Sequence, residues 1–378
     1  MQPMAQAQPT MPGNGYVLYE PSVEQIAPGE QEAIRAITQS IGRTNVRTFH
    51  KLHYAIRQQH AKGQGFLKGE LTVYRDLPDH LRQGLFAVAR TYPIIVRLST
   101  ALGDIRSDRI HVPRGMAIKV LGVGSAKALP EEDTSANQDF LLVNRKAYVS
   151  NAAAYLRLQH TIEWTLKAPD LALRTAGWVA RGVKSLFESF GKPSPLPPAL
   201  RGLAEASNNL LGETLHSMAA LRFGVNIAKI RAVPTAETLR KLAGRPINPG
   251  DNGLREFVVE FFRNNAAEYE LCAQLCTDLR RMPVEDASVE WPEDVSAPQP
   301  IARISLPCQQ ADSPQRRAYA DDVLSFNPWH CLADHQPLGS IMRLRKQAYR
   351  TSSEFRNGRG KEKGKTIIEP RDISEFPD

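Results

Sequence analysis

Hydrophobic and polar residues form short runs along the middle of the chain that predict β-strands. Seven runs are rich in β-branched and aromatic residues and are bounded by Gly, Pro or Asp: 66–74, 94–100, 117–122, 140–144, 221–232, 256–263 and 301–306. Few regular helices separate the first four runs. The pattern therefore predicts an antiparallel sheet or barrel in an α+β protein and argues against a doubly wound α/β fold.

Helical periodicity appears in other parts of the chain. Residues 22–42 repeat isoleucine at helical spacing, and a second helical stretch is predicted over 46–59. A long helical insertion is predicted between the fourth and fifth strands, over about 152–218. Ser313-Pro314 is a typical helix N-cap followed by Pro at the first helical position, which predicts that the C-terminal part turns helical again.

The predicted insertion carries one strongly apolar helical face. Its members are Trp178, Val179, Gly182, Val183, Leu186, Phe187 and Phe190. Two interpretations are open. A helix packed on the barrel is the more common arrangement, and an interfacial helix beside an apolar substrate entrance, in peripheral contact with a membrane, is the alternative.

Composition narrows the class of protein. The 378 residues, 42% of them hydrophobic, suffice for two domains or for one large barrel with attached helices. No stretch approaches the roughly 18 uninterrupted apolar residues of a membrane span. Residues 1–16 are uncharged and lack the basic and apolar regions of a secretory signal, so they predict a disordered arm on a cytoplasmic protein.

The four cysteines do not indicate a metal or disulfide site. Cys272 and Cys276 lie four apart in a probable helix, and the chain has no Cys-x-x-Cys pair. We expect reduced, mostly buried thiols.

The net charge of +8 is concentrated near the C-terminus. Residues 343–365 contain nine Lys or Arg and two acids. Such a segment can contact phosphates or anionic lipid, but it lacks the interleaved aromatic residues of a single-strand binder. We therefore predict no nucleic-acid partner and interpret the segment as a solvated face that also holds an anionic ligand.

Two short patterns have the residues of a reactive site. His60 stands at the end of a predicted helix, before two nearby glycines, where it could be structural or catalytic. Arg345 and Tyr349 are four residues apart, so a helix places them on one face. A guanidinium beside a phenol favours the phenolate, although an ordinary surface pair has the same spacing.

Six motifs in a fixed order resemble the catalase superfamily of haem proteins. They are 57–66 (RQQHAKGQGF), 97–100 (RLST), 113–119 (PRGMAIK), Asn137 before an apolar strand, 291–293 with 326–328 (WPE and FNP), and 345–349 (RKQAY) followed by Arg356. The resemblance covers roughly 46–356. It implies an antiparallel β-barrel of about eight strands around a haem pocket, with helical insertions and a C-terminal helix that carries the haem ligand.

The resemblance also implies a domain plan. Residues 1–44 would be an N-terminal arm, and 45–310 the barrel with its helical insertion at about 152–218. Residues 311–378 would form a C-terminal wrapping segment with the ligand helix and a basic tail.

The implied cofactor is haem b with ferric iron. Tyr349 would be its ligand, supported by Arg345, because a phenolate is a strong anionic donor for ferric iron. The haem propionates would pair with three arginines, namely Arg57, Arg97 and Arg356.

On the opposite side of the haem, the resemblance implies acid–base chemistry. His60 would take a proton from the peroxide and return it to the leaving oxygen. Ser99 would orient the imidazole, and Asn137 would hydrogen-bond the peroxide.

Three departures from the family bear on substrate. Gln59 stands before the histidine where typical catalases have valine, and the superfamily's fatty-acid-hydroperoxide enzymes also have a polar residue there. Ala101 replaces a valine that narrows the channel. The chain ends soon after the ligand helix, without the extra domains of large catalases.

These features leave three hypotheses for function. The first is a haem hydroperoxidase that cleaves hydrogen peroxide or fatty-acid hydroperoxides, with weak catalase activity. The second is a lyase or isomerase of fatty-acid hydroperoxides, and the third a haem-binding protein with little turnover. The oligomeric state stays open between a homo-oligomer and a monomer.

Overall fold

The computed structural model describes residues 15–132, 135–192, 194–196, 198–204, 208–247, 249–361 and 366–378. Most of the arm predicted to be disordered, residues 1–14, lies outside this part of the chain, as does 362–365 of the basic tail.

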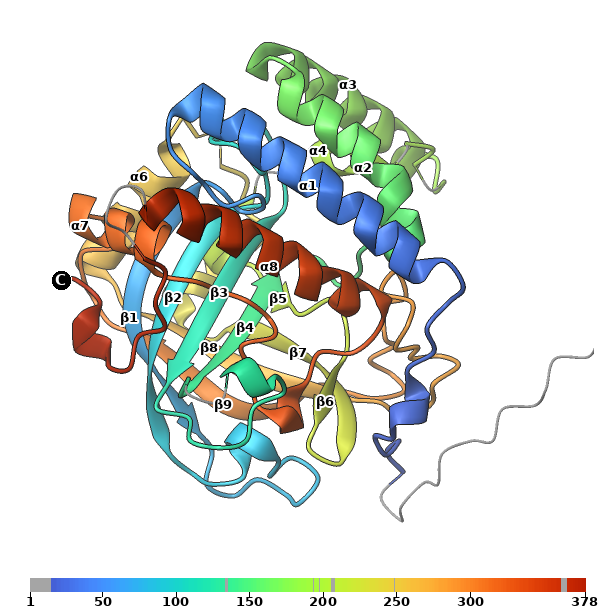
Figure 1. Cartoon of the computed structure of the whole chain (residues 1–378), viewed down its shortest axis with the longest axis vertical. Coiled ribbons are helices and arrows are strands. Elements are labelled where there is room, and N and C mark those ends of the chain that lie inside the picture. The colour runs from blue at the N-terminus through green and yellow to red at the C-terminus, as the bar shows by residue number, and fades with distance from the viewer. Residues whose placement is uncertain are drawn as a thin grey trace, which may run out of the picture.

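An antiparallel β-barrel forms the centre of the molecule (Figure 1). Its strands are β1 (Gly63–Val73), β2 (Thr91–Thr100), β3 (Arg114–Leu121), β4 (Asn137–Val143), β5 (Leu215–His216), β6 (Leu221–Phe223), β7 (Asn226–Pro234), β8 (Ala267–Leu275) and β9 (Gln299–Leu306). The strand order is β5-β4-β3-β2-β1-β9-β8-β7-β6, and β5 also pairs with β7. This second pairing closes a ring of eight strands, with β6 attached to β7 outside the ring. The predicted eight-stranded antiparallel barrel is confirmed.

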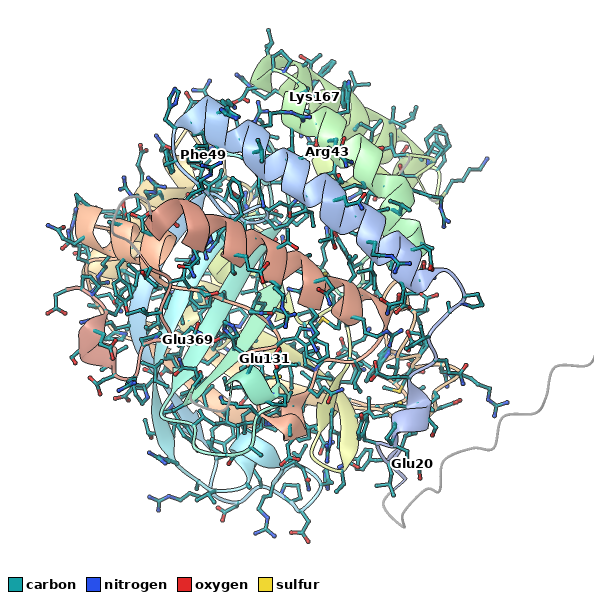
Figure 2. The ribbon with its side chains drawn as sticks, viewed as in Figure 1. Glu20, Arg43, Phe49, Glu131, Lys167 and Glu369 are labelled. Atoms are coloured by element: carbon teal, nitrogen blue, oxygen red, sulfur yellow. The ribbon has the colours of Figure 1, made fainter. Side chains whose placement is uncertain are left out.

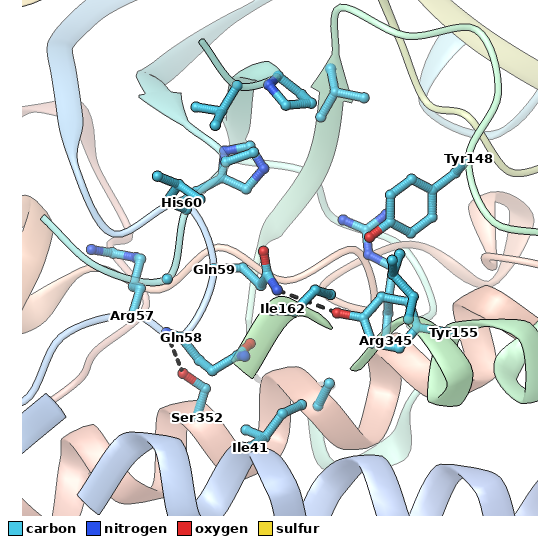
Figure 3. Close-up of a pocket in the computed structure, with 18 of the residues that line it drawn as sticks. Ile41, Arg57, Gln58, Gln59, His60, Tyr148, Tyr155, Ile162, Arg345 and Ser352 are labelled. Carbon is cyan, nitrogen blue, oxygen red and sulfur yellow. Dashed lines mark hydrogen bonds between the residues drawn. The ribbon is translucent and has the colours of Figure 1, made fainter. Parts of the chain in front are cut away.

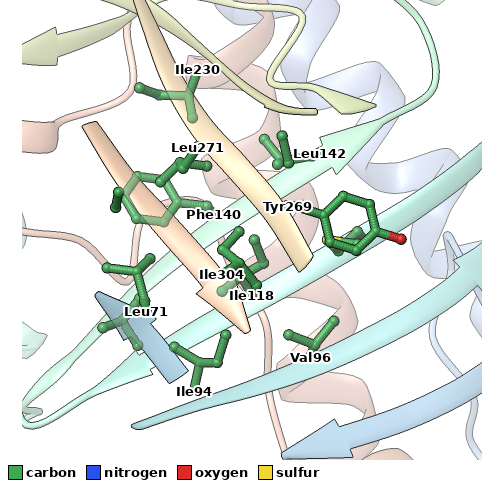
Figure 4. Close-up of a cluster of buried hydrophobic side chains, with 14 of the residues drawn as sticks. Leu71, Ile94, Val96, Ile118, Phe140, Leu142, Ile230, Tyr269, Leu271 and Ile304 are labelled. Atoms are coloured by element: carbon green, nitrogen blue, oxygen red, sulfur yellow. The ribbon is translucent and has the colours of Figure 1, made fainter. Parts of the chain in front are cut away.

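Alternate residues of these strands fill the barrel interior. Figure 4 shows the inward-facing side chains of strands on opposite sides of the barrel meeting in one cluster. On β3, Met116, Ile118 and Val120 belong to this cluster, whereas Lys119 lies outside it. An eight-stranded barrel is just wide enough for such side chains, so the interior is occupied and a large ligand must bind elsewhere.

Eight helices surround the barrel in the described part of the chain. They are α1 (Glu30–Leu52), α2 (Ala152–Lys167), α3 (Asp170–Ser189), α4 (Pro198–Leu203), α5 (Glu237–Arg240), α6 (Gly253–Asn264), α7 (Pro314–Ala318) and α8 (Ser340–Lys361). Helices α1 and α8 run alongside each other over one side of the barrel, and α2 lies against α1 (Figure 1). The predicted cap of α7 is present, because the Ser313 side chain accepts a hydrogen bond from Arg316 N.

Four predictions of local structure were wrong. Residues 256–263 lie in helix α6, and Cys272, expected on a helix, lies on strand β8. The two helices predicted over 22–59 are a single helix, α1, that ends at Leu52. The strand predicted over 221–232 is divided into β6 and β7 by a turn at Gly224, whose φ is +62°.

The basic excess near the C-terminus is partly neutralised by internal ion pairs. Arg343 on α8 contacts Glu24 and Glu30 at 2.7 and 2.6 Å, and Glu285 at 2.7 Å. Glu30 is buried at the start of α1. These contacts fix α1 against α8 and so build one side of the cavity described next.

Candidate functional site

A cavity of about 290 Å³ lies between the outer surface of the barrel and helices α1, α2 and α8. His60, Tyr349, Arg57 and Arg356 all line it. The barrel contributes the segment before β1 and the ends of β2 and β4, and Figure 3 shows how the labelled side chains surround the open space. The predicted pocket is therefore present, on the outside of the barrel wall, since side chains fill the interior.

His60 is held in a fixed orientation at this cavity. The chain leaves α1 at Leu52 and reaches β1 through an irregular stretch in which His60 has a φ of +53°. Its Nδ1 lies 3.0 Å from Ser99 Oγ on β2, so the predicted pair is formed. A Cβ atom on Gly115 of β3 would lie only 2.6 Å from the imidazole Cε1. The ring therefore depends on a glycine at position 115.

Burial lowers the pKa of His60 to about 3, and the positive charges of Arg97 and Arg345 add to this effect. The imidazole is therefore neutral at ordinary pH and can accept a proton. The left-handed backbone of His60 is strained for a residue other than glycine, and such strain is often found at functional positions.

Arg97 supports His60 from behind the cavity wall. It donates from Nη1 to the backbone oxygen of His60 at 2.9 Å and from Nη2 to that of Ala61 at 3.2 Å. Sequence resemblance assigned Arg97 to the cofactor. In the structure its first contacts are with the strained turn, and it is absent from the cavity lining.

Tyr349 and Arg345 enter the cavity from α8. Arg345 Nη2 donates to Tyr349 Oη at 3.0 Å, and its guanidinium lies 5.3 Å from the centre of the phenol ring. The pair predicted from the four-residue spacing is therefore formed. A charged donor therefore contacts the oxygen atom through which a tyrosine binds ferric iron.

Three arginines, of which Arg97 and Arg356 are buried, converge on Asp321. Arg57 Nη1 lies 2.9 Å from Asp321 Oδ1, and Arg97 Nη2 lies 3.5 Å from the same oxygen. Arg356 Nη1 donates to the backbone oxygen of Asp321 at 2.7 Å. Burial lowers the pKa of Arg356 to about 10, and the charge of Arg97 acts in the same direction, while Asp321 opposes the shift.

Even with Asp322, whose charge also acts on Arg356, two carboxylates do not balance three guanidinium groups. Among the described residues, the buried Nε atoms of Arg97 and Arg356 have no hydrogen-bond partner. Arg356 lines the cavity, so this part of the site has the charge and an unused donor to hold an anionic group. Sequence reasoning missed Asp321, which lies in a π-helical turn, Tyr319–Val323. Such turns are frequent at functional sites but have no clear sequence signature.

Gln59 and Ala101, the two residues predicted for a substrate channel, both line the cavity, and their role there stays a prediction. Gln59 Nε2 donates to Tyr155 Oη at 3.3 Å (Figure 3). Tyr155 on α2 and Tyr148 before it were not predicted. Burial raises the pKa of both phenols, which keeps them neutral.

The prediction for Asn137 was wrong. β4 begins at Asn137, which pairs with Leu121, whereas Val143 at its other end pairs with Gly115 beside His60. Six residues of strand separate the two ends by about 20 Å. Asn137 is fully buried and donates to Glu369 Oε2 and to the Pro370 carbonyl, both at 3.0 Å. It cannot reach a ligand beside His60.

The described residues fit a haem group. One cavity presents a phenol that accepts from arginine, a neutral imidazole, and a cationic side with unused donors. The remaining lining is mostly aliphatic, including Ile37, Ile41, Val143, Leu158, Ile162, Leu166 and Leu344. A flat apolar macrocycle with two carboxylates needs these surroundings.

Comparison with solved structures shows the fold. No protein-family model matches the chain, and no curated protein matches it by sequence. Among solved structures, catalase A from Saccharomyces cerevisiae matches 82% of the chain with a TM-score of 0.53 at 16% identity. A fungal catalase matches 88% (TM-score 0.53, 16% identity) and a bacterial catalase 94% (TM-score 0.54, 14% identity). The chain spans 62% of the yeast protein and 67% of each of the other two. The protein has a catalase-like fold.

Proposed function

We propose that this protein is a haem-dependent hydroperoxidase in which Tyr349 binds ferric iron and His60 performs acid–base catalysis. The observation that carries the proposal is the opening of three features into one cavity. They are the Arg345–Tyr349 pair, the His60 ring held by Ser99, and Arg57 and Arg356 beside Asp321. When bound, haem supplies the redox-active iron that makes the O–O bond of a hydroperoxide easy to break.

His60 has the properties of the acid–base residue. Its neutral imidazole accepts the hydroperoxide proton and returns it to the oxygen that leaves. Ser99 engages Nδ1, which leaves Nε2 for proton transfer. Arg97 holds the backbone of His60 and so keeps the ring in place.

The cationic side of the cavity orients the cofactor. Arg57 and Arg356 line the cavity and bind the propionates, and Arg97 adds positive charge behind them. Asp321 holds the three guanidinium groups together, because their mutual repulsion in a buried site requires a counter-charge.

We further propose that the substrate is a fatty-acid hydroperoxide. The cavity extends between helices, where Ile37 and Ile41 of α1 face Leu158, Ile162 and Leu166 of α2. An aliphatic chain gains free energy by burial against such a wall, whereas hydrogen peroxide does not. Ala101 leaves more room at the barrel end than a valine would.

Haem binding is tested by titrating the purified protein with ferric haem. We expect the wild-type protein to bind one haem per chain. Tyr349→Phe should bind haem at least about tenfold more weakly than the wild type and should have an altered absorbance spectrum. Tyr148→Phe is the matched control, because it removes a phenol from the same cavity and should leave the spectrum unchanged. If the wild-type protein takes up no haem, the proposed function is wrong.

The substrate is tested with hydrogen peroxide and fatty-acid hydroperoxides, followed by product analysis. We expect kcat/KM for the fatty-acid hydroperoxide to be at least about tenfold higher than for hydrogen peroxide, because only the fatty-acid chain contacts the aliphatic wall. Gln59→Val should raise the rate with hydrogen peroxide. Faster turnover of hydrogen peroxide than of every lipid hydroperoxide would exclude the lipid substrate, and rearranged products without a reductant would favour a lyase or isomerase.

A further inference from the structure

Helix α3 exposes large apolar side chains that no described part of the protein covers. Trp178, Phe190 and Leu171 are 72%, 71% and 71% exposed, and Val179 and Leu186 lie on the same face at more than half exposed. The opposite side of α3 packs through Leu173 and Ala180 in clusters that include Leu203 and Ala204 beside α4. Contiguous exposed apolar residues of this size indicate an interaction surface.

Helix α2, which directly precedes α3, has an exposed tryptophan and also lines the cavity. Trp164 on α2 is 53% exposed, while Leu158, Ile162 and Leu166 of the same helix line the cavity. Figure 1 shows the α2–α3 pair at the edge of the molecule, standing away from the barrel. One helical pair therefore carries both the exposed apolar face and a wall of the proposed active site.

The surroundings of this face are basic. Residues 157–192 contain six Lys or Arg and three acids. Two of these acids are paired, Asp170 with Arg106 at 2.7 Å and Glu188 with Lys184 at 3.8 Å. Arg43 on the neighbouring α1, Lys167 at the end of α2 and Arg174 on α3 are all exposed, and Figure 2 shows the first two on adjacent helices.

We infer that the exposed face of α2 and α3 docks on the surface of a bilayer that contains anionic phospholipid. Tryptophan and phenylalanine enter the boundary between headgroups and acyl chains, and the basic residues attract the lipid phosphates. A second copy of the chain fits less well, because its own basic residues would repel the first. No helix in the described residues is long and apolar enough to cross a bilayer.

Docking would place the cavity wall against the acyl chains, where a lipid hydroperoxide resides. The docking is independent of the proposed function, whereas this delivery rests on it. A haem-free protein can therefore still bind vesicles, and a failure of docking leaves the peroxidase assay unaffected.

Sedimentation of the full chain with vesicles tests the docking. We expect the protein to bind phosphatidylcholine vesicles that contain phosphatidylglycerol at least about tenfold more tightly than vesicles of phosphatidylcholine alone. High salt should weaken this binding. Trp178→Ser/Phe190→Ser should lower the affinity about tenfold or more. Lys167→Glu/Arg174→Glu should remove the preference for phosphatidylglycerol. The matched control is Ile26→Ser/Val88→Ser, which alters residues 61% and 67% exposed elsewhere and should bind normally.

Tryptophan fluorescence gives a second readout. Trp291 and Trp329 are 5% and 6% exposed, so in Trp164→Phe the exposed indole among the described residues is Trp178. Its emission should shift to shorter wavelength when mixed vesicles are added. Three results would overturn the inference: no binding to the mixed vesicles, an equal loss in the control variant, or a vesicle-free dimer that Trp178→Ser dissociates.

Discussion

His60→Ala is expected to lower kcat/KM for the preferred hydroperoxide by about 10²–10⁴-fold while haem binding stays within a factor of about two. The substitution removes the neutral imidazole and leaves Tyr349, Arg345 and the arginines around Asp321 in place. Because the pKa of His60 is about 3, the imidazole is unprotonated throughout the ordinary range. The wild-type rate should therefore show no loss between about pH 5 and 8 from titration of this residue. Stopped-flow absorbance separates haem binding from the peroxide step.

Gly115→Ala provides an independent way to disturb the same ring. The new Cβ would lie 2.6 Å from the imidazole Cε1, so His60 would have to move although its chemistry is intact. We expect a lower rate with haem retained. Gly122→Ala is unsuitable as the control because its φ is +73°. Gly182→Ala on α3 meets open space and should change neither rate nor haem content. Full activity of His60→Ala would remove His60 from the mechanism.

Lys119→Met is expected to destabilise the protein by about 3–5 kcal/mol, because it leaves a buried carboxylate without its lysine partner. Lys119 and Asp139 are both fully buried and are 2.8 Å apart. Lys119 also contacts Glu369 and lies 5.6 Å from the Phe326 ring, which lines the cavity. Denaturant unfolding measures the loss. Lys68→Met, which removes a pair with the almost fully exposed Asp378, is the control and should cost about 1 kcal/mol or less.

The size of this loss should depend on pH. Burial by itself raises the pKa of Asp139, but the Lys119 ammonium and the His330 ring together outweigh it and hold that pKa below its usual range. Burial lowers the pKa of Lys119, but the nearby carboxylates outweigh it and raise that pKa. A carboxyl whose pKa is lower in the folded protein stabilises the fold at pH values above its unfolded pKa of about 3.9. A lysine whose pKa is higher in the folded protein stabilises the fold at pH values below its unfolded pKa of about 10.4. The pair therefore contributes between about pH 4 and 10. In Lys119→Met the carboxyl can take a proton as pH falls, so the deficit should shrink in acid. An unchanged deficit from pH 8 to 5 would contradict this account.

Much of the barrel could be predicted because its strands carry strong local patterns. β1, β2, β3, β4 and β9 each combine β-branched residues with clear ends, and each was found near its predicted position. α6 was mistaken for a strand because its sequence, GLREFVVEFFRN, is rich in Val and Phe. Its buried residues, Leu254, Val258, Phe261 and Phe262, recur instead at helical spacing. Tertiary burial decided the outcome, and local propensity did not.

The Asn137 error has a simple geometric cause. In an antiparallel hairpin, the residue before the second strand lies at the turn, far from the start of the first strand. The residue at the His60 end of β4 is Asn144, whose Oδ1 accepts from Arg114 N at 2.7 Å and whose Nδ2 donates to Glu213 at 2.7 Å. Sequence order identified the strand correctly but assigned the amide to its wrong end. The convergence on Asp321 depended on chain segments about 220–265 residues apart, which no local pattern reports.

Closure of the barrel has a consequence for how the molecule opens. β5 joins β4 through one residue pair and β7 through two, whereas β1 and β2 share nine. Local unfolding begins where the fewest hydrogen bonds must break, so amide hydrogens along this seam should exchange faster than those of β1 and β2. The seam follows the α2–α4 insertion in sequence and borders the cavity at Val143 and Met218. The stretch of barrel wall beside the cavity is therefore also its weakest, and we expect the barrel to open there first.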